Sequence, residues 1–486
     1  MKKLFTIAAI VFAVLWLHGT FLGLTDDEAY YWALARNPGW GFAFHPPAVV
    51  WILSVFNIFG PHASTALVRL PSALGIASII FLILLLFKER KLLGARDQNA
   101  SEVTWNLVAF AGFFGVSWMM VPDTSLFLGW TLAFYSCWMW LEKGAGKYLW
   151  GLGVGVFICV LSKYSGVLVG LSLLAAVWKS KKRNAAIATI FAAGVFAVVP
   201  TVIWNAQHGW QALAYQFSER HGGSISLSRF SRFWMAEVLL AGPALLVFFF
   251  ICVKKWFSKG FFKKADPFER YVAFWAIPPA FIFCLQPLFS DFKLHWVFIA
   301  WFPILILLCE NLIGKRKSMT AKWHRRYGLT LLVILLLSCH IPVMQYAHAI
   351  FTPTHLPATL DVTNDLYGWN RLPELSGQPN LPVVASRYQT ASQAAFALRD
   401  LNRTRVTLIP RDLKQRDEWP DLKVTEGWGP AWPRLLKPVF FVADNRYSDG
   451  PHFKNATCAS LQPLETRRNG YLAKRISIWK CTPKSS

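Results

Sequence analysis

The sequence is built around apolar stretches of about 20 residues, the length that an α-helix needs to cross a lipid bilayer. These stretches recur from Leu4 to about Tyr346, and 55% of the 486 residues are hydrophobic while only 16% are charged. With a mean hydropathy of +0.37, the chain is too apolar for an ordinary water-soluble globular protein. The sequence therefore predicts a polytopic α-helical membrane protein and excludes a soluble enzyme.

The apolar stretches predict about eleven membrane spans. The first, Leu4 to Leu24, has no small-x-small cleavage site before the acidic residues at 26–28, so we interpret it as an uncleaved span and not as a signal peptide. The other spans are expected at residues 63–87, 104–121, 125–141, 148–162, 164–178, 185–204, 236–253, 271–289, 296–313 and 328–346.

Basic residues gather in alternate breaks between these spans. With the N-terminus inside, the cytoplasmic segments hold 24 Lys and Arg residues, and the outer segments of the membrane part hold seven. This bias predicts a multi-pass protein with a cytoplasmic N-terminus. A net charge of +24 would suggest a nucleic-acid partner in a soluble protein. No nucleic-acid partner is expected here, because the charges lie at span ends and are not interleaved with stacking aromatics in a polar groove.

The chain changes character after the last predicted span. Residues 1–346 are expected to form the transmembrane domain, with outer loops at 25–62 and 205–235, and residues 347–486 a soluble domain on the outer face. Buried strands are predicted near 382–385, 406–409 and 439–442, and a helix at 390–401, so the outer domain is expected to be a small α/β module. Cys458 and Cys481 both lie in it and could form a disulfide or remain free thiols.

The first outer loop contains the most concentrated group of carboxylates. Thr25 and Glu28 have the spacing of a capping box at the start of a helix. Helix capping and the helix dipole account for two acidic residues near a helix N-terminus, but not for three in succession beside the hydrocarbon of the membrane. We therefore expect Asp27 to have a functional role. Later in the loop, Pro46 and Pro47 follow His45 and would hold that histidine in a fixed orientation.

Other ionisable residues stand alone at the outer ends of spans. Lys163 divides an apolar stretch, where a charge at mid-bilayer would cost at least about 2.5–3.5 kcal/mol, so it is expected at the outer interface or in a cavity. Because all of these residues share one side of the membrane, they are expected to converge on one site, with a carboxylate as general base and cations opposite a phosphate leaving group. The converging residues are Asp27, His45, Asp123, Lys163, Lys293 and His295.

The second long outer loop, at 205–235, is polar and aromatic. We weigh two interpretations equally: an amphipathic interfacial helix, and a lid that contacts an anionic headgroup. Its ionisable and amide residues are Asn205, His208, Arg220, His221, Arg229 and Arg232.

Short motifs occur in a fixed order along the membrane part. They are Asp26-Asp27-Glu28-Ala29-Tyr30-Tyr31-Trp32, His45-Pro46-Pro47, Pro122-Asp123, Leu161-Ser162-Lys163-Tyr164, Pro200 with Trp204-Asn205 and His208, and Lys293-Leu294-His295-Trp296. Another, Asp365-Leu366-Tyr367-Gly368-Trp369, follows the last predicted span. As an ordered set they resemble the membrane C-type glycosyltransferases, in the bacterial branch related to protein O-mannosyltransferases and to the lipid A aminoarabinose transferase.

The resemblance implies an enzyme of the bacterial inner membrane that moves a sugar from a polyprenyl-phosphate donor to an acceptor at the outer leaflet, with inversion at the anomeric carbon. The acceptor would be lipid A, another envelope glycan, a lipid or a protein. By position, Asp27 matches the catalytic aspartate of the family, and catalytic roles are also expected for Glu28 and Asp123. The residues expected to contact the donor phosphate or the substrate are His45, Arg69, Lys163, Tyr164, Lys293 and His295.

The first-loop motif departs from the aminoarabinose enzyme. Where that enzyme carries Glu-Lys-Pro, this chain has Phe44-His45-Pro46, and so lacks one acidic group and one lysine. If a divalent metal ion takes part, its expected ligands are Asp27, Glu28 and His45. No nucleotide cofactor is expected.

Two other classes of protein have many membrane spans. A transporter or flippase of a lipid-linked sugar would place charged or helix-breaking residues near the midplane, commonly in repeated halves. Here the ionisable residues lie at the outer ends of spans and the halves show no evident correspondence. A scaffold protein would not need eleven spans to anchor its outer domain. The pattern therefore favours the glycosyltransferase.

Overall fold

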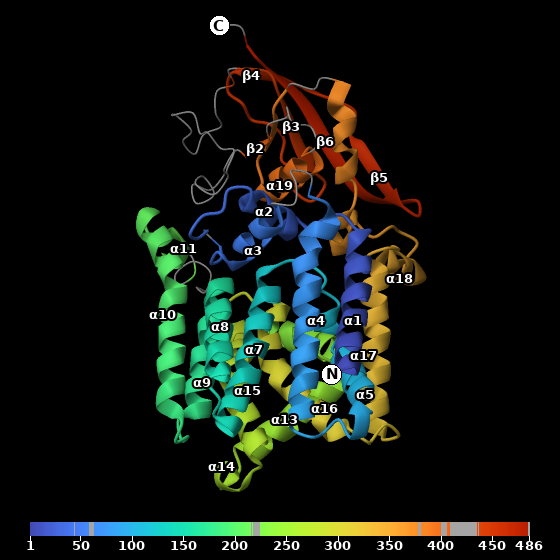
Figure 1. Ribbon diagram of the computed structural model, residues 1–486. Helices are drawn as coiled ribbons and strands as arrows, with labels where there is room; N and C mark the ends of the chain where they lie inside the picture. The colour runs from blue at the N-terminus through green and yellow to red at the C-terminus, as the bar shows by residue number, and fades with distance from the viewer. Residues whose placement is uncertain are drawn as a thin grey trace.

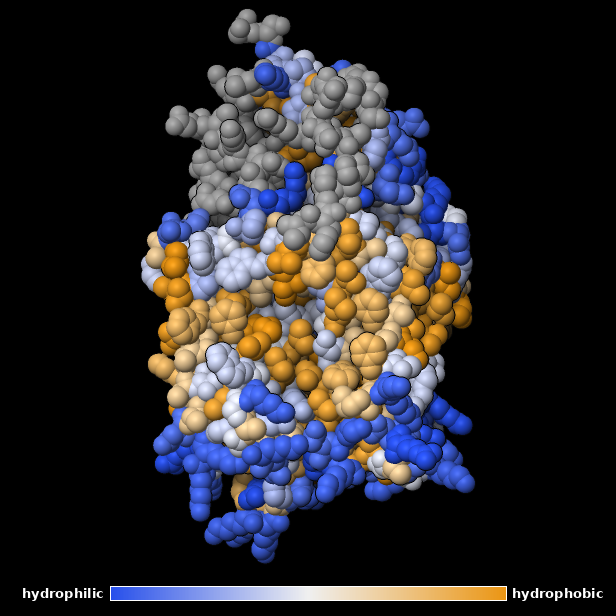
Figure 2. Space-filling view, in the orientation of Figure 1, coloured by the Kyte–Doolittle hydropathy of each residue, from blue (hydrophilic) through white to orange (hydrophobic). Residues whose placement is uncertain are grey.

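The structure, a computed structural model, describes residues 1–42, 44–57, 63–214, 216, 224–377, 381–399, 406–408, 435 and 437–484. A bundle of helices forms one end of the molecule and a sheet domain the other (Figure 1). On the face shown in Figure 2, a hydrophobic band covers the helical part and hydrophilic residues gather below it. This is the surface of a polytopic α-helical membrane protein with a small C-terminal sheet domain, as predicted.

The bundle consists of long apolar helices. Five are long and apolar enough to cross a membrane, and two bent pairs raise this number to seven among the described residues. The five are α1 (Lys2–Thr20), α4 (Thr65–Glu89), α10 (Arg183–Gln207), α15 (Pro267–Leu285, continued by a 3-10 turn to Leu288) and α16 (Phe298–Leu312, preceded by a 3-10 turn from Leu294). The others in the bundle are α7 (Pro122–Lys143), α8 (Lys147–Ser162), α9 (Leu168–Val177), α12 (Leu227–Leu240), α13 (Pro243–Trp256) and α17 (Met319–Ser338).

Two of the predicted spans are not single helices. The stretch at 236–253 is split between α12 and α13, which bend by 115° around Gly242, a residue with φ +86°. The stretch at 104–121 divides into α5 (Ala100–Val108), α6 (Ala111–Phe114) and irregular chain. A Cβ at Gly112 would lie 2.8 Å from the Leu240 carbonyl oxygen, so this segment packs closely into the bundle. Irregular backbone is tolerated at membrane depth where it is buried in protein or lines a cavity.

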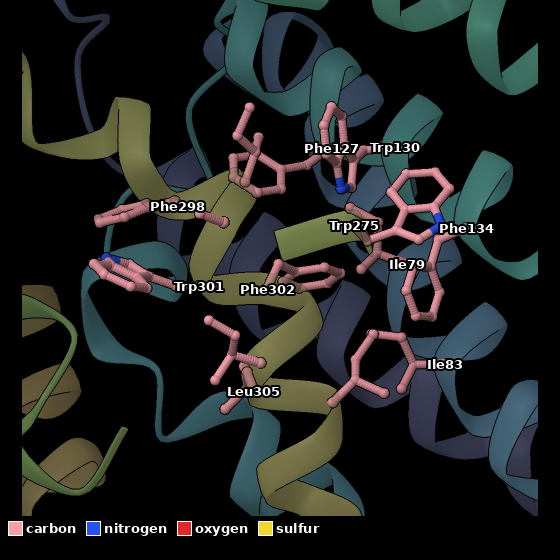
Figure 3. Close-up of a cluster of buried hydrophobic side chains, with 14 of the residues drawn as sticks. Ile79, Ile83, Phe127, Trp130, Phe134, Trp275, Phe298, Trp301, Phe302 and Leu305 are labelled. Atoms are coloured by element: carbon pink, nitrogen blue, oxygen red, sulfur yellow. The ribbon is translucent and has the colours of Figure 1, made fainter. Parts of the chain in front are cut away.

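Aromatic side chains fill the centre of the bundle. Trp130 of α7 and Trp275 of α15 meet edge to face with ring centroids 5.3 Å apart, and Phe134 packs against Trp275 at 5.2 Å (Figure 3). Phe127 and Phe302 join α7 to α16 in the same cluster. This packing fixes the ends of α7 and α16, where the polar residues of interest lie.

Two helices lie between the bundle and the sheet domain (Figure 1). They are α2 (Asp26–Ala35) and α3 (Ala48–Asn57), which together form most of the predicted outer loop at 25–62. Most of α2 is buried, because the bundle lies on one side and α19 (Tyr388–Ala397) packs on the other. The predicted domain boundary after residue 346 falls inside α18 (Val343–Phe351), which is bent by 103° from α17.

The C-terminal sheet has the strand order β2-β1-β3-β6-β4, with β5 also paired to β6. β1 (Val383–Ala385) runs parallel to β2 (Val406–Leu408) and β3 (Val439–Asp444), which confirms the three predicted strands. Helix α19 confirms the predicted helix, beginning and ending a few residues earlier. The antiparallel strands β4 (Ala456–Ser460), β5 (Leu464–Arg468) and β6 (Tyr471–Pro483) were not predicted.

A disulfide joins Cys458 to Cys481. The two residues lie directly opposite each other on β4 and β6, and neighbouring strands bring paired Cα atoms within bridging distance. The structure thus resolves the alternative that the sequence left open. The six other cysteines are free and buried, as expected for packing groups in apolar helices.

Candidate active site

The acidic triplet forms the first turn of α2. The predicted capping box is present: the Thr25 hydroxyl accepts a hydrogen bond from the Glu28 amide at 3.3 Å, and the Glu28 carboxylate accepts one from the Thr25 amide at 3.0 Å. Successive residues of an α-helix are rotated by about 100°, so the three neighbouring carboxylates point in three directions. Each therefore meets a different part of the protein.

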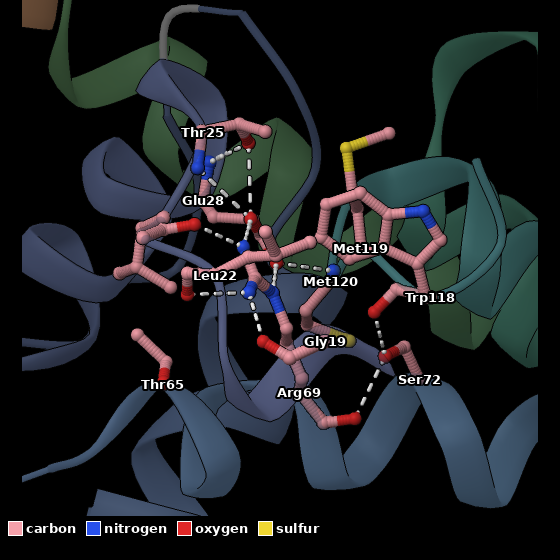
Figure 4. Close-up of polar contacts among 12 residues, drawn as sticks. Gly19, Leu22, Thr25, Glu28, Thr65, Arg69, Ser72, Trp118, Met119 and Met120 are labelled. Carbon is pink, nitrogen blue, oxygen red and sulfur yellow. Dashed lines mark hydrogen bonds and ion pairs between the residues drawn. The ribbon is translucent and has the colours of Figure 1, made fainter. Parts of the chain in front are cut away.

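Glu28 points into the bundle and pairs with Arg69 of α4 (Figure 4). The guanidinium donates to both carboxylate oxygens, at 2.6 and 2.8 Å, and neither side chain is exposed. The Met120 amide also donates to Glu28, at 3.1 Å. Arg69 further donates to the carbonyl oxygens of Gly19, Leu22 and Gly23.

This pair joins the end of α1, the start of α2, the start of α4 and the chain before α7. Neither Glu28 nor Arg69 lines the cavity described below. Their placement therefore favours a positioning role, in place of the catalytic role predicted for Glu28 and the phosphate-binding role predicted for Arg69.

Asp26 points the other way, toward the C-terminal domain. Its carboxylate accepts a hydrogen bond from the Gln393 side-chain amide of α19 at 3.1 Å, and an Arg446 nitrogen lies 3.9 Å away. Burial raises the pKa of Asp26 to about 7, and the nearby negative charge of Asp365 adds to this increase. Asp26 thus attaches α2 to the sheet domain.

Asp27, between these two anchored neighbours, faces a cavity of about 560 Å³. Its side chain is accessible to water in the cavity but closely surrounded by protein. Burial raises the pKa of Asp27, and the charge of Asp123 adds to the increase while that of Lys293 opposes it. Within the described part of the chain, the Asp27 carboxylate forms no hydrogen bond or ion pair, so it is available to act as a base.

The cavity lies at the end of the bundle that faces α2 and the sheet domain. It brings together all six residues that the sequence predicted to converge from distant parts of the chain, and one more acidic residue that was not predicted to belong to the site. The charged and histidine residues of its lining are Asp27, His45, Asp123, Lys163, Lys293, His295 and Asp365. Deeper apolar lining comes from Ile76, Phe113, Phe127, Leu240, Phe298 and Leu335.

Asp123 and Lys163 form an ion pair in the cavity wall. Asp123 lies in the first turn of α7, and Lys163 occupies the extended break after α8, with φ −158° and ψ 147°. The Lys163 ammonium lies 2.8 and 3.1 Å from the two Asp123 oxygens, and its side chain is 8% exposed. His295 Nε2 lies 3.5 Å from the same carboxylate. Much of the Lys163 charge is therefore balanced by Asp123.

Lys293 differs from Lys163 in its surroundings. It immediately precedes a 3-10 turn (Leu294–Val297) that leads into α16, and its side chain is exposed within the cavity lining. Its ammonium forms no ion pair with any residue that the structure describes. Of the groups in the cavity, the Asp27 carboxylate and the Lys293 ammonium thus have no ion-pair partner in the part of the chain that the structure describes.

Comparison with known proteins identifies the fold. The sequence model of the dolichyl-phosphate-mannose-protein mannosyltransferase family (PMT_2) matches residues 44–204. The crystal structure of ArnT from Cupriavidus metallidurans bound to undecaprenyl phosphate superimposes with a TM-score of 0.60, at 14% identity over 97% of each chain. The chain has the ArnT fold. The apo structure of the same ArnT gives a TM-score of 0.56 at 14% identity, covering 98% of this chain and 97% of ArnT.

These matches confirm the resemblance that the ordered motifs indicated. They extend it from the membrane part to the whole chain, because the C-terminal domain is included in the ArnT superposition. A search of curated protein sequences finds no match. The helical bundle and the sheet domain are thus those of the ArnT fold.

Some predicted residues lie away from the cavity in this ArnT fold. Tyr164 packs beside Trp204 and Ala212 and does not line it. In the loop at 205–235, Asn205 and His208 bond to the end of α10 and the turn that follows. Arg229 and Arg232 donate mainly to backbone carbonyls near α12. Arg220 and His221 lie outside the described residues.

The predicted metal ligands are not assembled as a set. Among the residues described, no group of three or more His, Cys, Asp or Glu side chains is placed to hold a metal ion. Glu28, one of the three predicted ligands, directs both carboxylate oxygens to Arg69. The donor set Asp27, Glu28 and His45 therefore does not fit a metal ion in this ArnT fold.

Proposed function

We propose that the protein is a glycosyltransferase of the bacterial inner membrane that moves a sugar from a polyprenyl-phosphate donor to an acceptor of the cell envelope. The observation that supports this best is the cavity itself, which is lined by cationic side chains and by Asp27, a carboxylate with no hydrogen-bond or ion-pair partner among the described residues. Single displacement at an anomeric carbon needs these two features, a base for the acceptor and positive charge for the leaving phosphate.

In this proposal the donor phosphate binds beside Lys293. Lys293 supplies a positive charge with no ion-pair partner among the described residues, and His295 and the Asp123–Lys163 pair line the same cavity. The apolar lining deeper in the bundle suits an isoprenoid chain. ArnT, whose fold this chain shares, was crystallised with undecaprenyl phosphate, which supports the same class of donor here.

The proposed reaction is a direct displacement with inversion. The acceptor oxygen attacks the anomeric carbon and a new carbon–oxygen bond forms as the bond to the carrier phosphate breaks. Asp27 takes the acceptor proton, and the departing polyprenyl phosphate keeps the bonding electron pair beside Lys293. Mass spectrometry of envelope lipids and glycans, from cells with and without the chain, tests the function. Identical sugar contents in the two samples would refute it.

Replacing Lys293 by Met should weaken undecaprenyl phosphate binding by about tenfold or more, because a charge-assisted contact contributes roughly 1.5–3 kcal/mol. Lys163→Met should also weaken binding, but it should lower stability as well, since it leaves the mostly buried Asp123 carboxylate without its closest partner. Binding is measured by titrating the purified full-length protein with undecaprenyl phosphate. Lys181→Met, at an exposed site outside the cavity, is the matched control. Unchanged affinity in Lys293→Met would remove Lys293 from the phosphate site.

We also propose that the N-terminus is cytoplasmic and that the C-terminal domain lies on the outer face. The Cys458–Cys481 disulfide supports this orientation, because disulfides persist in oxidising compartments. A cysteine introduced at the exposed residue Asn370 should react with a membrane-impermeant maleimide in intact spheroplasts. The unmodified chain is the control, since its six free cysteines are buried. Labelling of Asn370→Cys only after lysis would reverse the orientation.

A further inference from the structure

A strongly basic segment joins α13 to α15 at the end of the bundle opposite the sheet domain. It runs over residues 254–270 and includes the short helix α14 (Phe261–Lys264), which lies beyond the ends of the bundle helices in Figure 1. On the face shown in Figure 2, hydrophilic residues gather at this end, below the hydrophobic band. The segment contains two acidic residues, Asp266 and Glu269, and six basic ones, Lys254, Lys255, Lys259, Lys263, Lys264 and Arg270.

The acidic residues of the segment are occupied by local contacts. The Asp266 carboxylate caps α15 and accepts hydrogen bonds from the Phe268 and Glu269 amides, at 2.9 and 3.2 Å. Glu269 pairs with Lys255 at 2.6 Å. Arg270 donates to the Phe262 carbonyl oxygen at 3.0 Å. The remaining four lysines are exposed and form no ion pair with any residue that the structure describes; they are Lys254, Lys259, Lys263 and Lys264.

Other basic residues near the inner ends of the helices do have acidic partners. Lys88 pairs with Asp97 at 3.0 Å, and Arg316 pairs with Glu102 at 3.1 Å. The 254–270 segment instead keeps four ammonium groups without such partners within eleven residues. Like charges that lie close together repel each other, so an anionic partner would stabilise this arrangement.

Aromatic side chains accompany these lysines. Phe261 is buried, and the Phe262 ring stacks on Phe274 of α15 with centroids 5.2 Å apart, so both attach α14 to the bundle. Phe257, by contrast, is 76% exposed, between Lys255 and Lys259 in the sequence. A phenylalanine exposed among lysines suits the boundary between lipid headgroups and acyl chains, where the ring enters the apolar layer and the ammonium groups stay beside the phosphates.

The combination of charge and aromatic exposure indicates the kind of partner. Basic residues at the ends of spans also set membrane orientation, but that role needs charge alone and not an exposed ring. An acidic protein or an RNA would complement the charge as well. The segment, however, directly follows one apolar bundle helix and directly precedes another, which places the lysines at the level of lipid headgroups.

We propose that residues 254–270 form a binding surface for anionic phospholipids of the adjacent leaflet, which is the cytoplasmic leaflet in the orientation proposed above. The four lysines contact lipid phosphates, and the Phe257 ring lies among the upper parts of the acyl chains. This surface is separate from the cavity below α2, and the inference does not depend on sugar transfer.

Lipid titration of the purified full-length protein tests the proposal. The protein in neutral detergent is titrated with phosphatidylglycerol or with phosphatidylcholine of the same acyl chains, and bound lipids are counted by native mass spectrometry. Phosphatidylglycerol should bind more tightly. Replacing the four lysines together by Gln should weaken its binding by at least about tenfold, because one lysine near an anionic lipid surface contributes a factor of about five. Replacing the same four by Arg keeps the charge and should preserve binding.

The matched control removes four charges elsewhere. Lys179, Lys181, Lys315 and Lys317 lie in two other cytoplasmic breaks of the predicted topology and are exposed. Their joint replacement by Gln should leave phosphatidylglycerol binding close to that of the wild type. An equal loss in both quadruple variants would show that the overall positive charge is responsible, and would overturn the proposal. So would equal binding of the two lipids by the wild type.

Single variants and other anions complete the test. Phe257→Ala and Lys259→Gln, at exposed positions, should each weaken phosphatidylglycerol binding several-fold without changing the thermal midpoint of the lipid-free protein, so the test does not depend on the quadruple variant folding. Wild-type affinity in both would overturn the proposal. Competition by inorganic phosphate at the same concentration as the lipid would indicate a site for free anions. Binding of an RNA oligonucleotide without binding of phosphatidylglycerol would assign the surface to a different partner. Either result would refute the lipid assignment.

Discussion

Asp27→Asn is expected to reduce sugar transfer by about 10²–10⁴-fold while the protein still folds and binds undecaprenyl phosphate. The substitution keeps the size of the side chain and removes its capacity to accept a proton. Because Asp27 forms no hydrogen bond or ion pair in the described structure, no partner is left unsatisfied. Transfer is measured as sugar incorporated into envelope acceptors in membranes that contain equal amounts of each variant.

The pH dependence of sugar transfer is a second test of Asp27. Burial is the main cause that raises the pKa of Asp27, so transfer should decline as the pH falls through a value above that of an ordinary aspartate. At higher pH the carboxylate is ionised and the base is present. Asp26→Asn is the matched control, since Asp26 faces α19 and not the cavity, and it should reduce transfer far less. Near-normal turnover by Asp27→Asn would exclude Asp27 as the base.

The convergence of six residues could be predicted because membrane topology constrains position strongly. Once the spans and the distribution of basic residues are known, Asp123, Lys163 and Lys293 are expected on the same side of the membrane, whatever the packing. The length of the apolar stretches likewise predicted most helices of the bundle. It did not reveal the breaks at 109–121 and at Gly242, because an apolar stretch that folds back into a protein interior has the same composition as one that spans lipid.

The roles within the acidic triplet could not be predicted from spacing. Asp26, Asp27 and Glu28 differ only by rotation about one helix axis, and the direction in which each points depends on where α4, α19 and the cavity lie. Arg69 was expected to contact the donor phosphate or the substrate, and its pairing with Glu28, 41 residues away in the sequence, left no local signal. Asp365 stood in a motif that the resemblance singled out, but its place in the cavity depends on how the sheet domain docks.

Breaking the pair of Glu28 and Arg69 should have the largest effect on stability of any single change considered. In Glu28→Gln or Arg69→Met, one fully buried charge loses its partner, which costs about 3–5 kcal/mol. The thermal midpoint of the purified protein and its level in the membrane should both fall. The double variant Glu28→Gln/Arg69→Met removes both charges, so its loss should be smaller than the sum of the two single losses.

Activity per folded molecule separates positioning from catalysis for Glu28. If Glu28 only fixes the first turn of α2, the Glu28→Gln protein that does fold should retain substantial transfer, because Asp27 still faces the cavity. Arg90→Met is the control, because it breaks an ion pair with Glu310 outside the cavity. It shows how much transfer is lost when a partly exposed ion pair is removed away from the site. A Glu28→Gln protein as stable as the wild type yet inactive would restore the catalytic role that the sequence predicted. The buried network predicts the opposite, since a carboxylate that accepts from Arg69, Thr25 and Met120 has no remaining face toward the substrate.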